Sequence, residues 1–343
     1  MDNIYNLSLQ ELEEILAKWA QPVFHARQIF SWLYQKQAPE FSAMSNLSAD
    51  LRRRLEENFY LGALQLVKAA RSTDGTEKFL LELKDKHLIE AVLIPAEKRL
   101  TGCISTQVGC RFSCRLCASG LAGFKRNLTS GEMIEQVLYL KNNSRARRLT
   151  HLVFMGMGEP LDNYDQLLKA IRVINSASGL DIGARRMTIS TCGIVPGIKK
   201  LAQEKLQVEL SISLHAADQE IRSQLMPVNK IYPLAELIAA CRQYIRSTRR
   251  QITFEYALIQ GINSDLQMAE KLGKIVKSLK LCKVNLIPCN LVGELKVKPP
   301  DKLAILLFCD YLRRLGINVT LRKPRGQDIE GACGQLRLRY EKK

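Results

Sequence analysis

The chain has 343 residues, and its 51 Lys and Arg outnumber 34 Asp and Glu to give a net charge of +17. Its 46% hydrophobic and 25% charged residues are typical of a globular protein and exclude a disordered or fibrous one, while the length favours about two domains. No uncharged apolar run reaches the roughly 18 residues of a membrane span, and the first residues lack a secretory-signal pattern, so we expect a cytoplasmic protein without a membrane partner.

The positive charge is concentrated after the first 62 residues. Residues 1–62 contain six Lys and Arg against eight Asp and Glu, a net of −2, which leaves +19 for the rest of the chain. A surplus of this size favours a polyanionic partner, with nucleic acid as the first candidate. A solvated basic surface without a partner is the alternative, and charge does not distinguish RNA from DNA.

Residues 1–62 are predicted to form a small helical domain. Ser8 and Glu11 have the spacing of a capping box, which marks the start of a first helix. Apolar residues recur at helical spacing over 24–33 and again over 51–59, which predicts two more helices whose aromatic residues form a core.

Residues 63–97 are predicted to be a short β-rich connecting segment. The sequence Thr73-Asp-Gly-Thr76 is typical of a turn, and residues 79–81 and 89–94 are apolar runs typical of strands. Pro95 ends the second of these strands.

From residue 98 to residue 343, strand-like runs alternate with helical patterns. The seven predicted strands are 102–106, 151–155, 187–190, 208–214, 252–259, 284–287 and 319–321. Helical patterns such as 131–141, 164–175, 221–225 and 234–246 lie between them. This alternation predicts an α/β fold with a parallel sheet, and seven units predict a closed or partial (β/α) barrel whose chemistry lies at the carboxyl ends of its strands.

A cluster of cysteines follows the first predicted barrel strand. Cys110, Cys114 and Cys117 have the spacing Cys-x3-Cys-x2-Cys. Three thiolates can hold three irons of a cubane cluster and leave the fourth open for catalysis, whereas a structural zinc site is normally complete with four ligands. Cys103 could supply a fourth ligand, so a zinc-stabilised RNA-binding module remains an alternative.

Polar residues and glycines end several other predicted strands. The segments are Gly156-Met-Gly158-Glu159-Pro160, Ser190-Thr-Cys192-Gly193, Ser213-Leu214-His215 and Asn290. Glycine allows a backbone to approach a ligand, and a glutamate can receive an ammonium group. Each segment alone could be an ordinary turn or a structural histidine, but their recurrence at successive strand ends favours one binding site.

The cysteine spacing, after the first strand of an α/β chain, resembles that of the radical S-adenosylmethionine superfamily. Many members have an aromatic residue where Leu116 stands, so the packing of the protein against the adenine of S-adenosylmethionine is expected to differ in detail. The resemblance implies a partial barrel of this type, one [4Fe-4S] cluster held by Cys110, Cys114 and Cys117, and cleavage of S-adenosylmethionine to a deoxyadenosyl radical.

Nearly the whole chain resembles the RlmN/Cfr family of RNA methyltransferases, and the RlmN branch more than Cfr. The resemblance rests on the segments 24–32, 89–95, 103–110, 156–163, 213–216 and 325–336. The family usually has alanine at the position of Gly331, and Pro160 and Cys192-Gly193 favour RlmN. The resemblance to RlmN implies methylation of carbon 2 of a specific adenine in 23S rRNA and in the tRNA anticodon loop. Cfr-type methylation of carbon 8 is the near alternative.

The resemblance also implies roles for three residues outside the cluster motif. Cys333 takes a methyl group from one S-adenosylmethionine, and a second is cleaved to activate that methyl group, so two are used per turnover. After the methyl carbon has joined the adenine, Cys103 attacks Cys333, forms a transient disulfide and releases the base. Glu90 matches the base that removes the adenine proton; an exposed position on an alternating strand is the alternative interpretation of Glu90.

The remaining implications concern the cofactor contacts and the partners. The S-adenosylmethionine contacts would be Gly158, Glu159, Ser190, Ser213, Leu214, His215 and Asn290. An external electron donor, flavodoxin-like or another reductant, would be needed, and the RNA-modifying protein is expected to act as a monomer.

Overall fold

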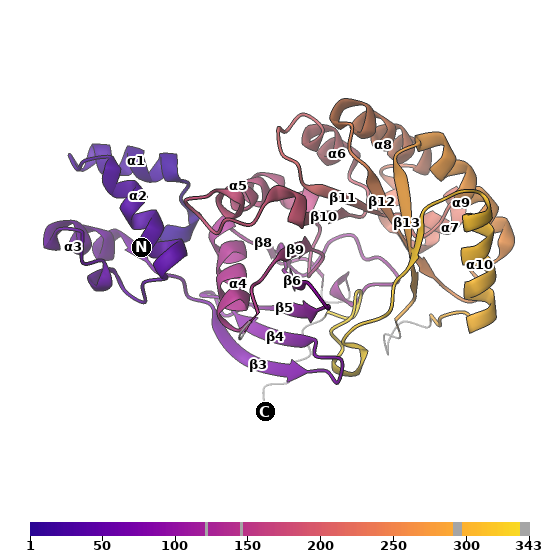
Figure 1. Ribbon diagram of the computed structural model, residues 1–343, viewed down its shortest axis with the longest axis horizontal. Helices are drawn as coiled ribbons and strands as arrows, with labels where there is room; N and C mark the ends of the chain where they lie inside the picture. The colour runs from indigo at the N-terminus through magenta and orange to yellow at the C-terminus, as the bar shows by residue number, and fades with distance from the viewer. Residues whose placement is uncertain (121–122, 145–146, 291–296, 337–343) are drawn as a thin grey trace.

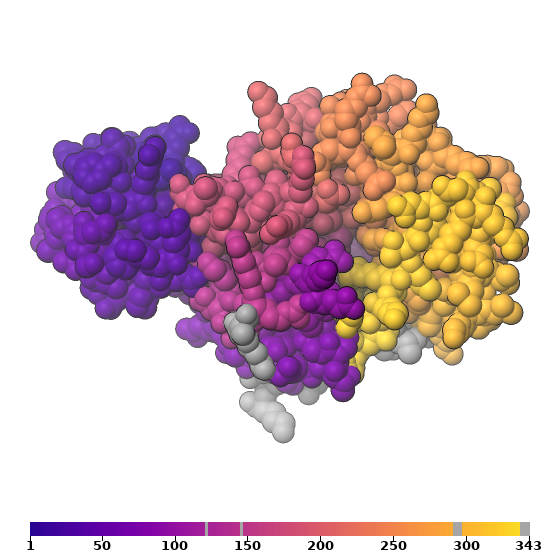
Figure 2. All heavy atoms as spheres, viewed as in Figure 1, coloured from indigo at the N-terminus to yellow at the C-terminus, as the bar shows by residue number. Residues whose placement is uncertain are grey.

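The computed structural model describes residues 1–120, 123–144, 147–290 and 297–336. The first 62 residues form a helical lobe at one side of the molecule (Figures 1 and 2). Its elements are β1 (Asp2–Asn3), α1 (Leu9–Lys18), α2 (Phe24–Phe30), a π-helical turn (Ser31–Lys36), α3 (Ala49–Asn58) and β2 (Phe59–Tyr60). The predicted capping box is present at α1, where Ser8 Oγ accepts from the Glu11 N–H and Glu11 Oε2 accepts from the Ser8 N–H.

A ten-stranded sheet of order β14-β13-β12-β11-β10-β9-β6-β5-β4-β3 forms the body of the protein. The strands are β3 (Gln65–Arg71), β4 (Glu77–Glu82), β5 (Leu88–Pro95), β6 (Leu100–Cys103), β9 (His151–Phe154), β10 (Met187–Thr191), β11 (Glu209–Ser213), β12 (Ile252–Leu258), β13 (Cys282–Pro288) and β14 (Val319–Leu321). The seven from β6 to β14 run parallel and confirm the predicted α/β architecture, whereas β3, β4 and β5 extend the sheet with antiparallel pairing.

The α-helices that follow residue 98 lie on the outside of the curved sheet (Figure 1). They are α4 (Ser130–Asn142), α5 (Tyr164–Asn175), α6 (Val195–Leu201), α7 (Gln219–Leu225), α8 (Leu234–Thr248), α9 (Leu266–Leu279) and α10 (Lys302–Arg314). Single 3₁₀ turns cover Ile4–Asn6, Phe41–Ala43, Ala118–Gly120, Pro160–Asn163, Ala184–Arg186, Pro227–Lys230 and Gln327–Ile329. A small ribbon pairs β7 (Gln107–Val108) with β8 (Arg126–Asn127). Among the helices of the described residues, none is long and apolar enough to cross a membrane.

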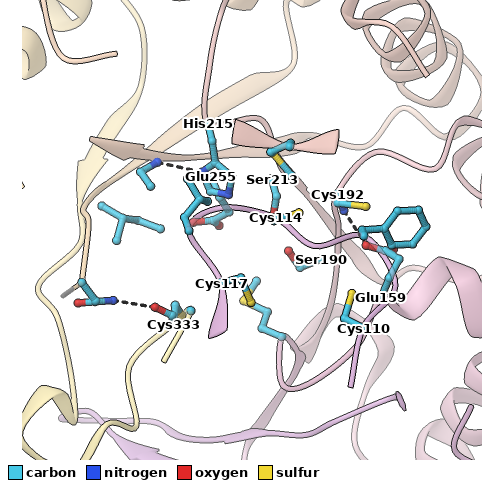
Figure 3. Close-up of a pocket in the computed structure, with 18 of the residues that line it drawn as sticks. Cys110, Cys114, Cys117, Glu159, Ser190, Cys192, Ser213, His215, Glu255 and Cys333 are labelled. Carbon is cyan, nitrogen blue, oxygen red and sulfur yellow. Dashed lines mark hydrogen bonds between the residues drawn. The ribbon is translucent and has the colours of Figure 1, made fainter. Parts of the chain in front are cut away.

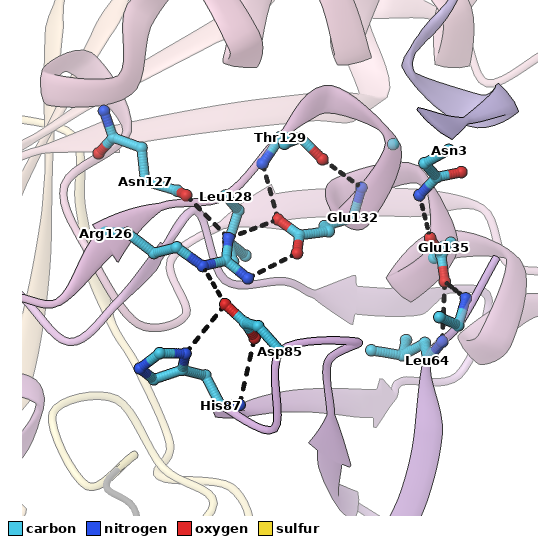
Figure 4. A network of polar contacts seen from close by, with 12 residues as sticks. Asn3, Leu64, Asp85, His87, Arg126, Asn127, Leu128, Thr129, Glu132 and Glu135 are labelled. Atoms are coloured by element: carbon cyan, nitrogen blue, oxygen red, sulfur yellow. Dashed lines mark hydrogen bonds and ion pairs between the residues drawn. The ribbon is translucent and has the colours of Figure 1, made fainter. Parts of the chain in front are cut away.

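Polar contacts join the helical lobe to helix α4 (Figure 4). Glu135 on α4 accepts from Asn3 Nδ2 at 2.5 Å and from the backbone N–H groups of Ala63 and Leu64 at 2.7 and 2.9 Å. Burial raises the pKa of this carboxyl group, and the three hydrogen bonds oppose that shift. The point at which the chain leaves the helical lobe is therefore fixed to α4.

The inner face of the barrel is polar where parallel strands lie in register. Ser213, Glu255, Asn285 and Thr320 occupy neighbouring positions across β11, β12, β13 and β14. Such a row of hydrogen-bonding side chains is unlike the branched apolar layers that fill an ordinary (β/α) barrel. It indicates that this part of the interior serves a ligand and not the core.

The segment after β14 returns to the opposite part of the sheet. Asp74 Oδ2 accepts from the Gly326 N–H at 2.9 Å, and Asp328 Oδ2 accepts from the Thr73 N–H at 3.1 Å. The turn between β3 and β4 thus holds residues 326–330, which lead directly to Cys333. We call residues 326–333 the Cys333 loop.

Candidate active site

One cavity of about 180 Å³ collects most of the expected site residues. Cys110, Cys114 and Cys117 line it together with Cys333, which arrives from the other end of the chain (Figure 3). The expected contacts Gly158, Glu159, Ser190, Ser213, His215 and Asn290 line the same cavity. Leu214 does not: its side chain is fully buried, and its backbone N–H donates to the Glu255 carbonyl at 3.0 Å.

The three cysteines lie on a loop whose path depends on glycine. Gly109 has a φ of +73°, and a Cβ there would lie 1.7 Å from the Gly123 carbonyl oxygen, so no other residue fits. Further along, the Cys117 N–H donates to the Cys114 carbonyl at 3.1 Å, and the Ala118 N–H donates to the Gly334 carbonyl at 2.7 Å. The loop is thereby attached to the residue next to Cys333.

The donor set fits an iron–sulfur cluster better than a single ion. In the part of the chain that the structure describes, no three His, Cys, Asp or Glu side chains are already arranged around one metal ion. A cubane cluster instead presents a different iron to each thiolate, so three separated cysteines around one cavity suit it. Burial raises the pKa of Cys110 to about 12 and raises that of Cys114 as well, a cost that a bound cluster's positive irons would reverse.

Glu159 is fixed at the edge of this cavity by backbone groups. Its Oε1 accepts from the Leu161 N–H at 3.0 Å, and its Oε2 accepts from the Cys192 N–H at 2.7 Å. Burial raises its pKa, and these bonds to the charged form oppose the shift. Gly158 has a φ of +99°, and a Cβ there would lie 2.5 Å from Gln107 Cβ, so the approach to Glu159 also requires glycine.

His215 is held as a neutral imidazole. It follows β11 with a φ of +55°, and its Nδ1 accepts from the Ala257 N–H at 3.0 Å. Burial lowers its pKa to about 3, and the charge of Arg222 acts in the same direction. The remaining ring nitrogen, Nε2, is therefore a donor on the cavity side.

Asn290 connects the barrel to the Cys333 loop. Its Nδ2 donates to the Cys333 carbonyl at 2.8 Å, and its Oδ1 accepts from Gln327 Nε2 at 2.8 Å. This expected cofactor contact therefore also supports the backbone of the expected methyl carrier.

A second, smaller cavity of about 20 Å³ contains Cys103. Cys333 and Asn290 line both cavities, so Cys333 lies on the wall that they share. Both cysteines are free thiols, and burial raises the pKa of Cys103 to about 12. Because Cys103 lines only the second cavity, it does not join the other three cysteines in a four-cysteine zinc site.

Glu90 lies outside the lining of both cavities. It is on β5, only 3% exposed, and its Oε1 lies 3.1 Å from Lys78 Nζ on β4. The alternative interpretation as an exposed strand residue is therefore wrong. A buried carboxylate paired with a lysine is compatible with a proton acceptor, and its catalytic role stays a prediction.

Three charged residues near the site were missed by the sequence analysis. Arg322 lines both cavities. The negative charge of a Cys333 thiolate raises the pKa of Arg322, and a hydrogen bond between the two side chains acts in the same direction, whereas burial lowers it. Glu255 lines the larger cavity; its Oε1 accepts from Asn285 Nδ2 at 3.0 Å, and burial raises its pKa. A charged residue within the apolar run of β12 was a usable signal for Glu255, but no local pattern indicates Lys78.

Comparison with known proteins gives consistent matches along the chain. Residues 2–61 match the model of the ribosomal RNA large subunit methyltransferase N-terminal domain, and residues 104–272 match the radical SAM superfamily. Two relatives, each described as a probable dual-specificity RNA methyltransferase RlmN, come from Clostridium novyi and Caldanaerobacter subterraneus. They are 47% and 44% identical over 99% and 100% of this chain, and 99% of each relative is covered.

A solved structure agrees with these matches. The crystal structure of a radical SAM methyltransferase from Sphaerobacter thermophilus superposes with a TM-score of 0.94 at 44% identity. The alignment covers 98% of this chain and 99% of that one.

Proposed function

Because the chain belongs to the RlmN family of radical SAM RNA methyltransferases, we propose that it adds a methyl group to carbon 2 of an adenine in 23S rRNA and in tRNA. The observation that carries the proposal is the position of Cys333 on the wall between two cavities. On one side lie the three cluster cysteines and the expected S-adenosylmethionine contacts. On the other lies Cys103. One sulfur can therefore face a methyl donor and a resolving thiol without a large movement of the chain.

The cofactor contacts are assigned by the chemistry of each side chain. Cys110, Cys114 and Cys117 would hold the [4Fe-4S] cluster, which supplies the reductive cleavage of S-adenosylmethionine when it is bound. The carboxylate of Glu159 can receive the ammonium group of S-adenosylmethionine, and the Nε2–H group of neutral His215 can donate a hydrogen bond. Ser190, Ser213 and Asn290 supply further hydrogen-bonding groups, and Gly158 leaves room. Leu214 is assigned no contact, because its backbone N–H and carbonyl are both bonded within the protein.

Two cysteines of the chain would act in turn, Cys333 as the carrier of the methyl group and Cys103 as the resolving thiol. The Cys333 sulfur, which lines the larger cavity together with Arg322, attacks the sulfonium methyl of S-adenosylmethionine and leaves S-adenosylhomocysteine. After the methyl carbon has been joined to the adenine, Glu90 accepts the proton from the modified carbon. Cys103 then attacks the Cys333 sulfur, the bond between that sulfur and the transferred carbon breaks as the disulfide forms, and the released methylene carbon takes up a proton to become the methyl group of the base. Burial of the Cys103 thiol restrains premature attack, because only the thiolate is nucleophilic.

We also propose that three segments of the chain have different roles. Residues 1–62 would be an accessory RNA-binding domain, residues 63–97 the connecting segment and residues 98–343 the catalytic barrel. The connecting strands share the barrel's sheet, so their contribution is to hold the Cys333 loop. All ten cysteines are free, which suits a reducing cytoplasm, and we propose that the protein acts there as a monomer with an external reductant.

The decisive experiment is an anaerobic assay of the reconstituted enzyme with S-adenosylmethionine, a reductant and either 23S rRNA or tRNA. Mass spectrometry of the digested nucleosides should show 2-methyladenosine. An 8-methyladenosine product would instead indicate Cfr-type chemistry.

Cysteine variants test the order of steps in the same assay. Cys103→Ala should leave RNA covalently attached to Cys333, whereas Cys333→Ala should give neither adduct nor product. Normal turnover by Cys103→Ala would contradict the resolving role.

A further inference from the structure

Lys78 connects two parts of the site that are distant in the sequence. From β4, its Nζ lies 3.1 Å from Glu90 Oε1 on β5 and donates to the Glu330 carbonyl at 3.2 Å. The strand register places Lys78 opposite Val92, two residues from Glu90, which is the diagonal distance that a long side chain spans. One ammonium group thus contacts both the expected base and the Cys333 loop.

The surroundings of this contact make it more than a surface ion pair. The side chains of Lys78 and Glu90 are only 15% and 3% exposed. A carboxylate removed from water to this extent is costly unless it is paired and hydrogen-bonded. Lys78 supplies such a charge, so it favours the ionised form that a proton acceptor needs. Exposed pairs, by contrast, contribute little.

We propose that Lys78 is a positioning residue of the methylation reaction, which holds Glu90 ionised and fixes its distance from the Cys333 loop. The inference rests on the proposed roles of Glu90 and Cys333. At the stage where Glu90 acts, the adenine is still joined to Cys333 through the transferred carbon. The carboxylate must then reach one proton of a base whose place is set by the Cys333 loop. A single ammonium bonded to both sides sets that geometry.

This role predicts a defect confined to the late steps. Methylation of the Cys333 sulfur and cleavage of S-adenosylmethionine do not involve Glu90, so loss of Lys78 should leave both unchanged. Proton removal should slow. The expected loss, about 10- to 100-fold, is smaller than the roughly 10²- to 10⁴-fold contribution of a general base, since Glu90 itself remains.

The test compares Lys78→Met and Lys78→Gln with wild type in the reconstituted holoenzyme. S-adenosylmethionine with a deuterated methyl group allows mass spectrometry to follow Cys333 methylation and nucleoside product, and chromatography follows 5′-deoxyadenosine. In a single turnover, we expect 2-methyladenosine formation to slow about 10- to 100-fold in both variants, with Cys333 methylation and 5′-deoxyadenosine formation within twofold of wild type. Lys78→Arg, which keeps the charge, should recover most of the rate.

Two comparisons separate positioning from a merely structural role. In a Glu90→Gln background, Lys78→Gln should cause little further loss, because the two residues act as a unit. Lys86→Met is the matched control: Lys86 pairs with Glu82 at 2.8 Å on the same hairpin, but its side chain is 74% exposed, and its loss should leave product formation within twofold.

Three results would overturn the inference. These are wild-type product formation by Lys78→Gln, an undiminished loss in the Glu90→Gln background, or a parallel loss of Cys333 methylation, which would indicate general damage to the site. Failure of the wild-type enzyme to form 2-methyladenosine is a different outcome, which would refute the proposed function.

Discussion

Removal of the Asp74 carboxylate should loosen the Cys333 loop while the fold stays intact. Asp74 lies in the turn between β3 and β4, where Oδ1 accepts from the Thr76 N–H at 2.9 Å and Oδ2 accepts from the Gly326 N–H at 2.9 Å. Partial burial raises the pKa of this carboxyl group, but hydrogen bonds from Thr76 and Gly326 outweigh it and hold the pKa at about 2. Among the hydrogen bonds that Asp74 accepts, only the one from Gly326 reaches the Cys333 loop.

The magnitude follows from the bond that Asp74→Ala deletes. A hydrogen bond to a charged group contributes about 1.5–3 kcal/mol, and 1.4 kcal/mol is a factor of ten, so local opening should become about 10- to 100-fold more frequent. The free energy of global unfolding should fall by no more than the same amount, about 1.5–3 kcal/mol, and the contacts of Asp328 and Lys78 with the loop remain, so the fold should stay intact.

Hydrogen–deuterium exchange of peptides covering 325–333 measures this opening directly. Asp85→Ala is the matched control, since Asp85 lies in the next hairpin turn and has a lowered pKa, but bonds Arg126 at 2.6 Å instead of the Cys333 loop. Asp74→Ala should accelerate the exchange of these peptides, and Asp85→Ala should not.

The pH dependence has a definite sign. A carboxyl group whose pKa is lowered by folding stabilises the folded form above its unfolded pKa of about 3.8, and that contribution is lost as the pH falls toward about 2. The loop should therefore stay docked throughout pH 5–8. Unchanged exchange in Asp74→Ala would refute the conclusion that the hairpin holds the Cys333 loop.

Further predictions concern the cluster, the histidine and the lobe contact. Cys114→Ala should lose most of the iron and sulfide that reconstitution gives wild type, measured by metal and sulfide analysis, whereas Cys241→Ala in the core should retain them. His215, with a pKa of about 3, should show an unprotonated Nδ1 from pH 5 to 8 in nuclear magnetic resonance spectra of selectively labelled, metal-free protein; titration near pH 6 would contradict its buried geometry. Glu135→Ala should cost about 1–3 kcal/mol in urea unfolding, because one buried and two partly buried donors lose their acceptor, while Glu82→Ala, which breaks a pair with the exposed Lys86, should cost less than about 1 kcal/mol.

Local patterns were sufficient for most of the fold. The capping box at Ser8 marks the start of α1 where it was predicted, and the predicted strands 187–190 and 252–259 correspond to β10 and β12 within one residue. Capping boxes and buried parallel strands depend on neighbours in the sequence, so periodicity and residue type identify them.

Contacts between distant segments were not accessible in the same way. The group of cysteines from 110 to 117 is local, so its spacing, together with the family resemblance, predicted an iron–sulfur cluster. The Asp74 contact with Gly326 spans 252 residues, and the Lys78 contact with Glu330 also spans 252. Nothing in the sequence immediately around Lys78 or Asp74 indicates a partner so far away.

The sequence by itself therefore determined the α/β barrel, the iron–sulfur motif and, through family resemblance, the expectation that Cys333 and Cys103 are the two thiols of the reaction. Only the tertiary structure decided that Cys333 lies between two cavities, and that Lys78 and Asp74 hold the loop on which it lies. The reason is physical. Spacing within a loop or strand determines which groups are neighbours in one element. The contact between the segment after β14 and the β3–β4 hairpin depends instead on how the whole sheet curves and extends.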